Sequence, residues 1–330
     1  MGRPACIQKI DYERYGCMIC DSPVFLVGSM RSGTTLLRLM LDHHPDIAFN
    51  LESEFLVTQI SDDGTFPDAE KYREFLRNDR VFRHSRFDIK DDLDFVAMVN
   101  DFLEQKRLRD GKSIVGATVH RQFSKIGRIW PKAKYIYILR DGRDVASSVV
   151  RMGWAGNLYV SADLWLEAEM EWKHYRQMIS SGSWIEVRYE ELVANPREVL
   201  TRICHFLGVD YSDRIFDYVK NSSYTMPDVA LNYQWKKRMG KKDLQRLEAK
   251  IGERLQARGY ELSGYPRITL SSTKKTYLAL HSRIGCFIYR IRKFGAVLVI
   301  REMIARRLGL KGHHRRISRM LDEIVDASLK

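Results

Sequence analysis

Short apolar runs alternate along most of the chain with longer segments whose apolar residues recur at helical spacing. Four runs are short enough to be buried strands, namely Val24–Val27, Ser113–Val115, Tyr135–Leu139 and Trp184–Val187. Helical spacing is found at Leu36–Leu41, Leu164–Tyr175, Arg197–Leu207 and Lys241–Arg258. This alternation predicts an α/β fold with a parallel sheet flanked by helices, because strands buried on both faces read as continuous apolar runs.

The chain beyond residue 265 has a different character. Pro266 marks the expected end of the compact body, and Tyr277–Leu308 is expected to form one or two amphipathic helices that contain Gly285 and Gly295. We therefore expect an N-terminal segment at 1–22, an α/β domain at 23–265 and a basic helical extension at 266–330.

Composition and charge narrow the classes of function. The 330 residues are 45% hydrophobic and 29% charged, which suits a globular protein and excludes a disordered one. The net charge is +13, and from residue 271 onward 14 Lys or Arg stand against four Asp or Glu, so the last 60 residues carry +10 of it. Because this charge lies in the extension, and not in a patterned patch on the body, nucleic-acid binding is not expected.

The extension allows two interpretations. Its alternating apolar and basic residues fit a helix that lies on anionic lipid, which would place the protein at the periphery of a membrane. They also fit a helical addition whose apolar residues pack on the body, and the large number of apolar positions favours this packed addition.

Several features point to a cytoplasmic protein without a metal. The longest apolar run in the extension, Phe294–Ile300, ends at Arg301 and is too short to span a membrane. The first residues lack the apolar stretch of a signal peptide, and five cysteines are too few for a disulfide framework. Cys17 and Cys20 form a lone C-x2-C pair without the second pair that a zinc site needs.

The segment Gly28–Thr35 carries the clearest chemical signal. It lies between a predicted strand and a predicted helix, and its two glycines are spaced as in a phosphate-binding loop. The position of the Walker A lysine holds Thr34, and the nearest cation in the loop is Arg31. A nucleoside triphosphatase uses that lysine together with magnesium, so this loop is predicted to hold a short anionic group without a triphosphate–metal complex.

The string RSGTTLLRLMLDHHPDI resembles the phosphosulfate loop of sulfotransferases that use 3′-phosphoadenosine 5′-phosphosulfate (PAPS), especially the protein-tyrosine and bacterial sulfotransferases. The resemblance implies a P-loop-type α/β enzyme that moves a sulfuryl group from PAPS to a hydroxyl and releases adenosine 3′,5′-bisphosphate, with no metal. It also implies that the 5′-phosphate and the sulfuryl group are held by Arg31, Ser32, Gly33, Thr34 and Thr35.

Three later segments extend the resemblance to the rest of the nucleotide. Arg140 follows a strand and Ser148 lies eight residues on, the family pattern for the 3′-phosphate, and an arginine with a hydroxyl is chemically suited to a phosphate. Tyr189, in RYEELVANP, matches the family tyrosine that lies against the base, although it could equally anchor a turn. Lys236 and Arg238 match a late basic loop that closes over the nucleotide.

The catalytic residues are less settled by the sequence. Glu52 lies in an expected loop 21 residues after Arg31, the spacing of the catalytic base in the tyrosine sulfotransferases, and Glu54 stands two residues further on. The family lysine that assists the leaving oxygen is missing from the segment before the second motif. His120 or Arg121 could replace it, or His120 could be the base in place of Glu52; Arg31 is a further catalytic candidate.

The acceptor stays open. A glycan, a lipid-linked sugar, a small alcohol and a peptide tyrosine all satisfy the requirement for a hydroxyl, because acceptor pockets are built from variable loops. Two other functions compete with sulfuryl transfer. One is a P-loop kinase of a small substrate, and the other is a catalytically inactive nucleotide-binding homologue, which the missing lysine would suit.

Overall fold

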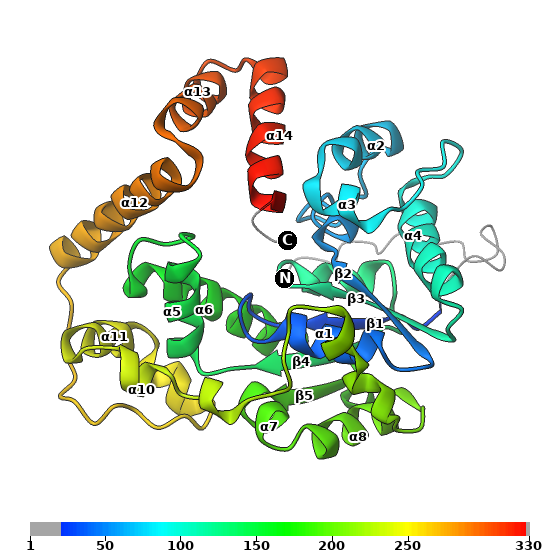
Figure 1. Cartoon of the computed structure of the whole chain (residues 1–330), viewed down its shortest axis with the longest axis horizontal. Coiled ribbons are helices and arrows are strands. Elements are labelled where there is room, and N and C mark those ends of the chain that lie inside the picture. The colour runs from blue at the N-terminus through cyan, green and yellow to red at the C-terminus, as the bar shows by residue number, and fades with distance from the viewer. Residues whose placement is uncertain (1–20, 328–330) are drawn as a thin grey trace, which may run out of the picture. The chain divides into compact units, whose positions relative to one another are not determined.

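A parallel sheet organises the part of the chain that the computed structural model describes, residues 21–327 (Figure 1). All neighbouring strands are parallel and stand in the order β2-β3-β1-β4-β5. The predicted parallel sheet is confirmed, and each of the four predicted runs falls in a strand, although β3 begins at Ile114 and not at Ser113 and continues past Val115 to Val119. The strands are β1 (Val24–Val27), β2 (Ile47–Glu52), β3 (Ile114–Val119), β4 (Lys134–Leu139) and β5 (Trp184–Arg188).

Helices connect the strands and form the C-terminal part of the chain, and the helical segments predicted from spacing are confirmed. The helices are α1 (Thr34–Asp42), α2 (Ala69–Asn78), α3 (Arg80–Ser85), α4 (Phe95–Asp110), α5 (Gly142–Arg151), α6 (Leu158–Tyr175), α7 (Tyr189–Ala194), α8 (Pro196–Leu207), α9 (Tyr218–Asn221), α10 (Trp235–Arg238), α11 (Lys241–Ala257), α12 (Ser272–Phe294), α13 (Ala296–Arg307) and α14 (Lys311–Ala327).

The expectation of a loop around Glu52 was wrong, because residues 47–52 form the edge strand β2. Ile47, Ala48 and Phe49 are buried and pair with β3, whereas Leu51 and Glu52 at the end of the strand are exposed. The change from buried to exposed positions within six residues hides the strand from a search for continuous apolar runs.

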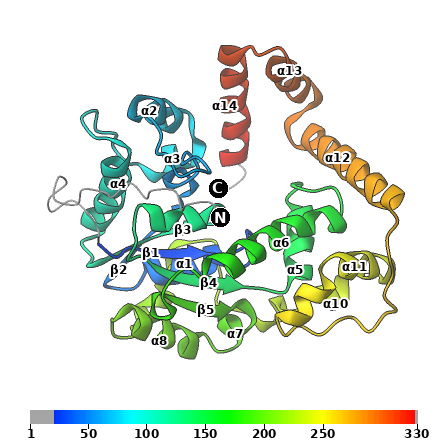
Figure 2. The same cartoon turned by 180° about the vertical axis from the view of Figure 1, so that it is seen from behind.

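The central strand β1 and its neighbour β4 are buried on both faces, which explains their uninterrupted apolar sequence. On one face, Leu26 of β1 and Ile138 of β4 join the apolar cluster formed with α1, α7 and α8. On the other face, Phe25 lies 5.1 Å from the ring of Trp130, and Tyr137 stacks at 4.6 Å on Trp172 of α6. Figure 2 shows the sheet from behind, with α6 on that side.

The described chain divides into two compact units. The first contains the sheet and consists of the chain up to Asp141 together with Leu164–Gln234. The second consists of Gly142–Asp163 and the chain from Trp235 onward. In the second unit, Arg143 of α5 is fully buried: it pairs with Glu248 of α11 at 2.7 Å and its guanidinium lies 3.6 Å from the ring of Trp235.

The C-terminal helices confirm the expected helical extension but not its packing. The region predicted as one or two helices contains α12 and α13, which are separated by Gly295. One side of α12 packs closely on the turn after α5, since a Cβ on Gly156 would lie 2.4 Å from the carbonyl oxygen of Ser282. Most apolar side chains of α12 and α13 are exposed, for instance Ile284 and Ile304. The expectation that the apolar residues of the extension are packed against protein was therefore wrong for these two helices. None of the described helices is long and apolar enough to cross a membrane.

Candidate functional site

The loop between β1 and α1 is held in a conformation that depends on glycine. Gly28 has φ +145°, and a Cβ there would lie 2.5 Å from the carbonyl oxygen of Ile138 on β4. Gly33 has φ +95°, and Arg31 itself adopts a left-handed φ of +70°. A non-glycine residue in this region carries strain, and such strain is concentrated at functional sites.

The loop presents hydrogen-bond donors that suit an anion. No side chain caps the N-terminus of α1, and the first N–H groups of a helix have no acceptor within the helix. The hydroxyl of Ser32 is buried and has no hydrogen-bond partner among the described residues. An unpaired buried hydroxyl beside an uncapped helix N-terminus fits a bound phosphate or sulfonate oxygen.

Arg140 and Tyr189 lie directly beside this loop. The Arg140 guanidinium is 4.0 Å from the centre of the Tyr189 ring, and its Nη2 donates to the carbonyl of Leu231 at 3.0 Å. Its Nη1 reaches the carbonyl of Arg31 at 3.5 Å, while its buried Nε has no partner among the described residues. The structure thus brings together residues of the first and second sequence motifs, and the unpaired Nε fits a second anionic group.

The position of Tyr189 favours the turn anchor over contact with a base. Its ring is buried, and a Cβ on Gly33 would lie 2.2 Å from its Cδ2 atom. The ring therefore fills the space between the phosphate loop and Arg140. The ring fixes the position of the loop relative to Arg140, and it has little exposed surface on which a nucleotide base could stack.

A chain of hydrogen bonds connects the loop to a carboxylate. The hydroxyl of Thr34 is 3.0 Å from Nε2 of His120, and Nδ1 of His120 is 2.8 Å from Oε1 of Glu54. The backbone N–H of His120 also donates to the same Glu54 oxygen, at 3.1 Å. Thr34 and His120 are both buried. Glu54, His120 and Thr34 therefore form one connected unit at the N-terminus of α1.

The charge state of Glu54 determines how this unit is protonated. Burial raises the pKa of Glu54, but the hydrogen bond and the attraction from His120 outweigh it, so the pKa lies below its ordinary value. An ionised Glu54 can only accept, so Nδ1 of His120 donates to it. In the neutral imidazole Nε2 is then the unprotonated, basic nitrogen, and it accepts a hydrogen bond from the Thr34 hydroxyl.

Glu52, the base expected from the sequence, has a different environment. It ends β2 with its side chain exposed, and it makes no hydrogen bond or ion pair within residues 21–327. Burial lowers the pKa of Arg38 on α1, and the negative charges of Asp42 and Glu52 oppose that shift. The structure connects Glu54 to the phosphate loop, and it shows no such connection for Glu52.

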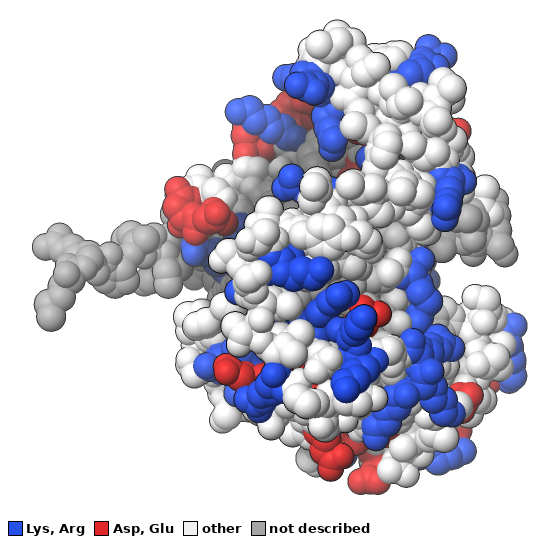
Figure 3. Space-filling view, turned by 90° about the vertical axis from the view of Figure 1, so that its left-hand side faces the viewer, with Lys and Arg blue, Asp and Glu red and all other residues white. Residues whose placement is uncertain are grey.

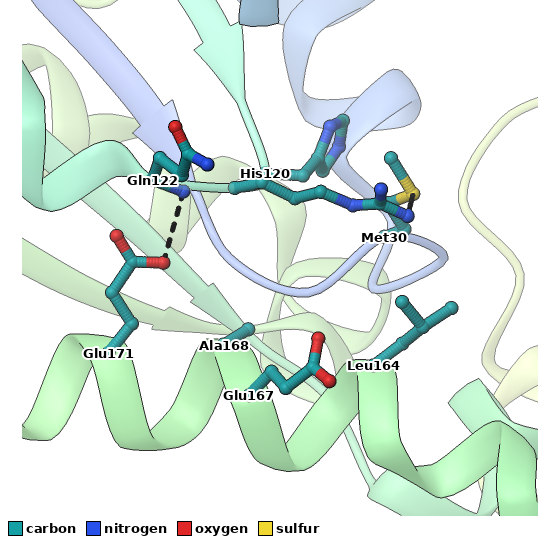
Figure 4. A pocket seen from close by; sticks show the side chains of 8 residues that line it. Met30, His120, Gln122, Leu164, Glu167, Ala168 and Glu171 are labelled. Atoms are coloured by element: carbon teal, nitrogen blue, oxygen red, sulfur yellow. Dashed lines mark hydrogen bonds between the residues drawn. The ribbon is translucent and has the colours of Figure 1, made fainter. Parts of the chain in front are cut away.

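A pocket of about 220 Å³ opens beside His120 (Figure 4). One side of the pocket is lined by Met30 and by residues 120–122. The other side is lined by four residues of α6, namely Leu164, Glu167, Ala168 and Glu171. The Glu171 carboxylate already has hydrogen-bond partners, because it accepts from the backbone N–H and the hydroxyl of Ser124, both at 2.8 Å. Burial raises the pKa of Glu171 above its ordinary value, although these hydrogen bonds oppose the shift.

Two opposite charges in this pocket have no charged partner. Glu167 points from α6 into the pocket in Figure 4 and makes no hydrogen bond or ion pair in the described chain. Within residues 21–327, Arg121 reaches only the sulfur of Met30, at 3.9 Å. Sequence reasoning missed Glu167, although its one signal was visible: Glu167 and Glu171 recur one turn apart on a predicted helix.

The remaining predicted residues belong to the second unit. Ser148 is buried on α5, whereas Lys236 and Arg238 are exposed on the short helix α10. The pair Cys17 and Cys20 lies outside the described residues. Within residues 21–327, no group of three His, Cys, Asp or Glu side chains could hold a metal ion.

Known proteins share both the sequence pattern and the fold. A family model described as "Sulfotransferase family" matches residues 23–213. Protein-tyrosine sulfotransferase A of Caenorhabditis elegans is 24% identical over 59% of this chain and 52% of its own length. Protein-tyrosine sulfotransferase 2 of Gallus gallus is 25% identical over 59% of this chain and 53% of its own length. The chain thus spans about half the length of these two relatives.

A solved structure supports the architecture. The sulfotransferase domain of the Synechococcus PCC 7002 olefin synthase aligns with a TM-score of 0.53 at 20% identity. The alignment covers 73% of this chain and 97% of that domain. At this identity the likeness concerns the fold, and it agrees with the predicted P-loop-type sheet.

Proposed function

This chain belongs to the sulfotransferase family, and we propose that it transfers the sulfuryl group of PAPS to a hydroxyl with His120 as the catalytic base. PAPS supplies the activated sulfuryl group, and no metal is needed. The observation that carries the assignment of the base is the hydrogen-bonded unit of Glu54, His120 and Thr34 at the phosphate loop.

Each residue of this unit has a role that follows from its contacts. Nε2 of His120 takes the proton of the acceptor hydroxyl, because it is the basic nitrogen and belongs to a side chain that lines the pocket. Glu54 holds the ring and offsets the positive charge that the imidazole gains. When no acceptor is bound, the Thr34 hydroxyl donates a hydrogen bond to Nε2, and this bond orients the imidazole ring toward the loop.

The donor would be held by residues on both sides of Tyr189. The N–H groups at the start of α1 and the unpaired Ser32 hydroxyl suit the 5′-phosphosulfate, together with Arg31, Gly33 and Thr35. Arg140 suits the 3′-phosphate, because its Nε is unpaired and two of its other nitrogens bond only to backbone carbonyls. By family resemblance, Ser148 is assigned to the 3′-phosphate, and Lys236 and Arg238 are assigned to a loop that closes over the nucleotide.

Donor binding can be tested without knowing the acceptor. In a thermal-unfolding titration, adenosine 3′,5′-bisphosphate at about 100 times its Kd should add about 2.7 kcal/mol and raise Tm by several degrees. Arg140→Ala should abolish most of that rise, whereas Arg214→Ala, an exposed arginine elsewhere in the first unit, should leave it intact. A rise with Mg·ATP and none with the bisphosphate would instead support the kinase, and no rise with either would contradict a donor site.

We further propose that the acceptor is a polar molecule with separate positive and negative groups, because Glu167 and Arg121 face the pocket unpaired. Tyramine, tyrosine and 3-(4-hydroxyphenyl)propionate share one phenol and differ only in charge. Glu167→Gln should raise KM for tyramine, and Arg121→Gln should raise KM for the propionate. Each increase should be about fivefold, since a partly exposed charge contact contributes about 1 kcal/mol.

The contrast between the two variants is the informative result. Glu253→Gln removes one exposed carboxylate on α11 and should change none of the three KM values. If both pocket variants affect the three phenols alike, charge recognition by this pocket is refuted, whatever the outcome for donor binding.

A further inference from the structure

One side of α12 is an exposed apolar face formed by Tyr277, Leu280, Ile284, Phe287 and Ile288. Their spacing of three or four residues places them on one side of the helix. Each is between 36% and 57% exposed, although burial of such side chains is ordinarily favourable. The opposite side, with Leu278 and Ser282, is buried. The exposed face is therefore not the side that attaches α12 to the rest of its unit.

The next helix repeats the arrangement. On α13, Val297, Ile300 and Ile304 follow the same spacing, which Leu308 continues directly after the helix, and the four side chains are 46% to 73% exposed. Val299, Glu302 and Ala305 of the same helix are buried. Two consecutive helices thus each expose an apolar face and bury the other side.

Unpaired arginines border both faces. At 100° per residue, Arg283 and Arg292 fall on the two edges of the α12 face, and Arg301 falls on an edge of the α13 face. These three arginines make no ion pair within residues 21–327. Figure 3 shows one side of the molecule, on which Lys and Arg are spread among uncharged side chains while Asp and Glu are sparse.

A buried carboxylate joins the three C-terminal helices. Glu302 of α13 accepts from Arg290 of α12 and from His314 of α14, both at 3.0 Å. Its side chain is 7% exposed, so these pairs are internal contacts. The structure therefore separates cations that hold the helices together from cations that are left facing outward beside the apolar faces.

We propose that the exposed faces of α12 and α13 dock the protein on an anionic lipid membrane. Apolar side chains would enter the boundary of the acyl chains while the bordering arginines meet the lipid phosphates. A second copy of the same face would instead bring arginines beside arginines, in a segment of net charge +10 from residue 271 onward. This docking uses no residue of the donor site.

Co-sedimentation of the full chain with vesicles tests the proposal. The vesicles are phosphatidylcholine alone, or phosphatidylcholine with about one third phosphatidylserine. Arg283→Gln/Arg292→Gln/Arg301→Gln should weaken binding to the anionic vesicles on the order of 100-fold, because each cation near the surface contributes about 1 kcal/mol, which is roughly fivefold in affinity. The matched control, Lys71→Gln/Lys173→Gln/Lys242→Gln, removes equal charge from exposed positions outside α12–α14 and should bind as the parent does.

A second variant separates the apolar contribution from charge. Leu280→Gln/Ile284→Gln/Ile288→Gln keeps every arginine and should also lose most vesicle binding, with an unchanged or higher unfolding temperature because these side chains are exposed. Equal binding to both vesicle types, or equal binding by the parent, the triple-arginine variant and the apolar variant, would overturn the proposal. Lipid-free dimers that the apolar variant abolishes would assign the face to a second copy and overturn it as well.

Discussion

Replacing His120 by Ala should lower the rate of sulfuryl transfer by about 10²- to 10⁴-fold, because a positioned base contributes that much to proton transfer. Binding of adenosine 3′,5′-bisphosphate should persist, since His120 meets the phosphate loop only at the hydroxyl of Thr34. The measurement is the initial rate at which PAPS yields the bisphosphate in the presence of tyrosine, tyramine or a hydroxyl acceptor found by screening.

Two neighbouring carboxylates provide the matched comparison. Glu54→Gln leaves an amide in place of the carboxylate that orients His120, so the rate should fall, though by less than in His120→Ala. Glu52→Gln alters an exposed side chain without a hydrogen bond in the described chain, and the rate should change little. The opposite pattern, with Glu52→Gln inactive and Glu54→Gln active, would restore Glu52 as the base and refute the role given to His120.

Gly33→Ala should destroy the donor site. The added Cβ would stand 2.2 Å from the ring of Tyr189 at a φ of +95°, so the loop, the ring or both must move. We expect a loss of stability of about 1–2 kcal/mol from backbone strain and about 1–3 kcal/mol more from overpacking. The rise in Tm on adding adenosine 3′,5′-bisphosphate should disappear, because Tyr189 would no longer hold the loop beside Arg140.

Gly208→Ala is the control for strain alone. Gly208 follows α8 with φ +83°, and a Cβ there would meet no atom within 4 Å. This variant should lose only the strain contribution and keep the bisphosphate-induced rise. Equal losses of stability in Gly33→Ala and Gly208→Ala, with ligand binding retained in both, would show that the contact between Gly33 and Tyr189 does not shape the site.

Local sequence was sufficient for most of the sheet. Val24–Val27 and Tyr135–Leu139 are continuous apolar runs because β1 and β4 are buried on both faces. β2 escaped detection because it lies at an edge and its last two residues are exposed. The amphipathic helices were also predictable. The same spacing of apolar residues, however, is found in a helix whose apolar side packs on protein and in a helix whose apolar side is exposed. The exposed faces of α12 and α13 therefore could not be inferred from spacing.

The donor site was more accessible to sequence reasoning than the catalytic one. Loop glycines and the arginine after β4 leave local signatures, and parallel strands bring their carboxyl ends to one edge. The contact between Glu54 and His120 joins residues 66 positions apart, and no local pattern encodes it. The spacing from Arg31 selected Glu52. In the structure Glu52 is the exposed last residue of β2, and Glu54, two residues later, contacts His120. The division of the chain into two interleaved units likewise depends on long-range contacts.

The strand order has a consequence for synthesis of the protein. Among the strands of residues 21–327, β1 is translated first, yet it pairs with residues 116–119 on one side and 134–137 on the other. The N–H and C=O groups of β1 therefore lack a partner strand until residues 116–119 have been translated, and lack the second partner until residues 134–137 follow. An unpaired apolar strand of this kind favours chaperone capture or aggregation. The loop Gly28–Thr35 can take the conformation seen here only after Tyr189, whose ring packs against Gly33, has also been translated.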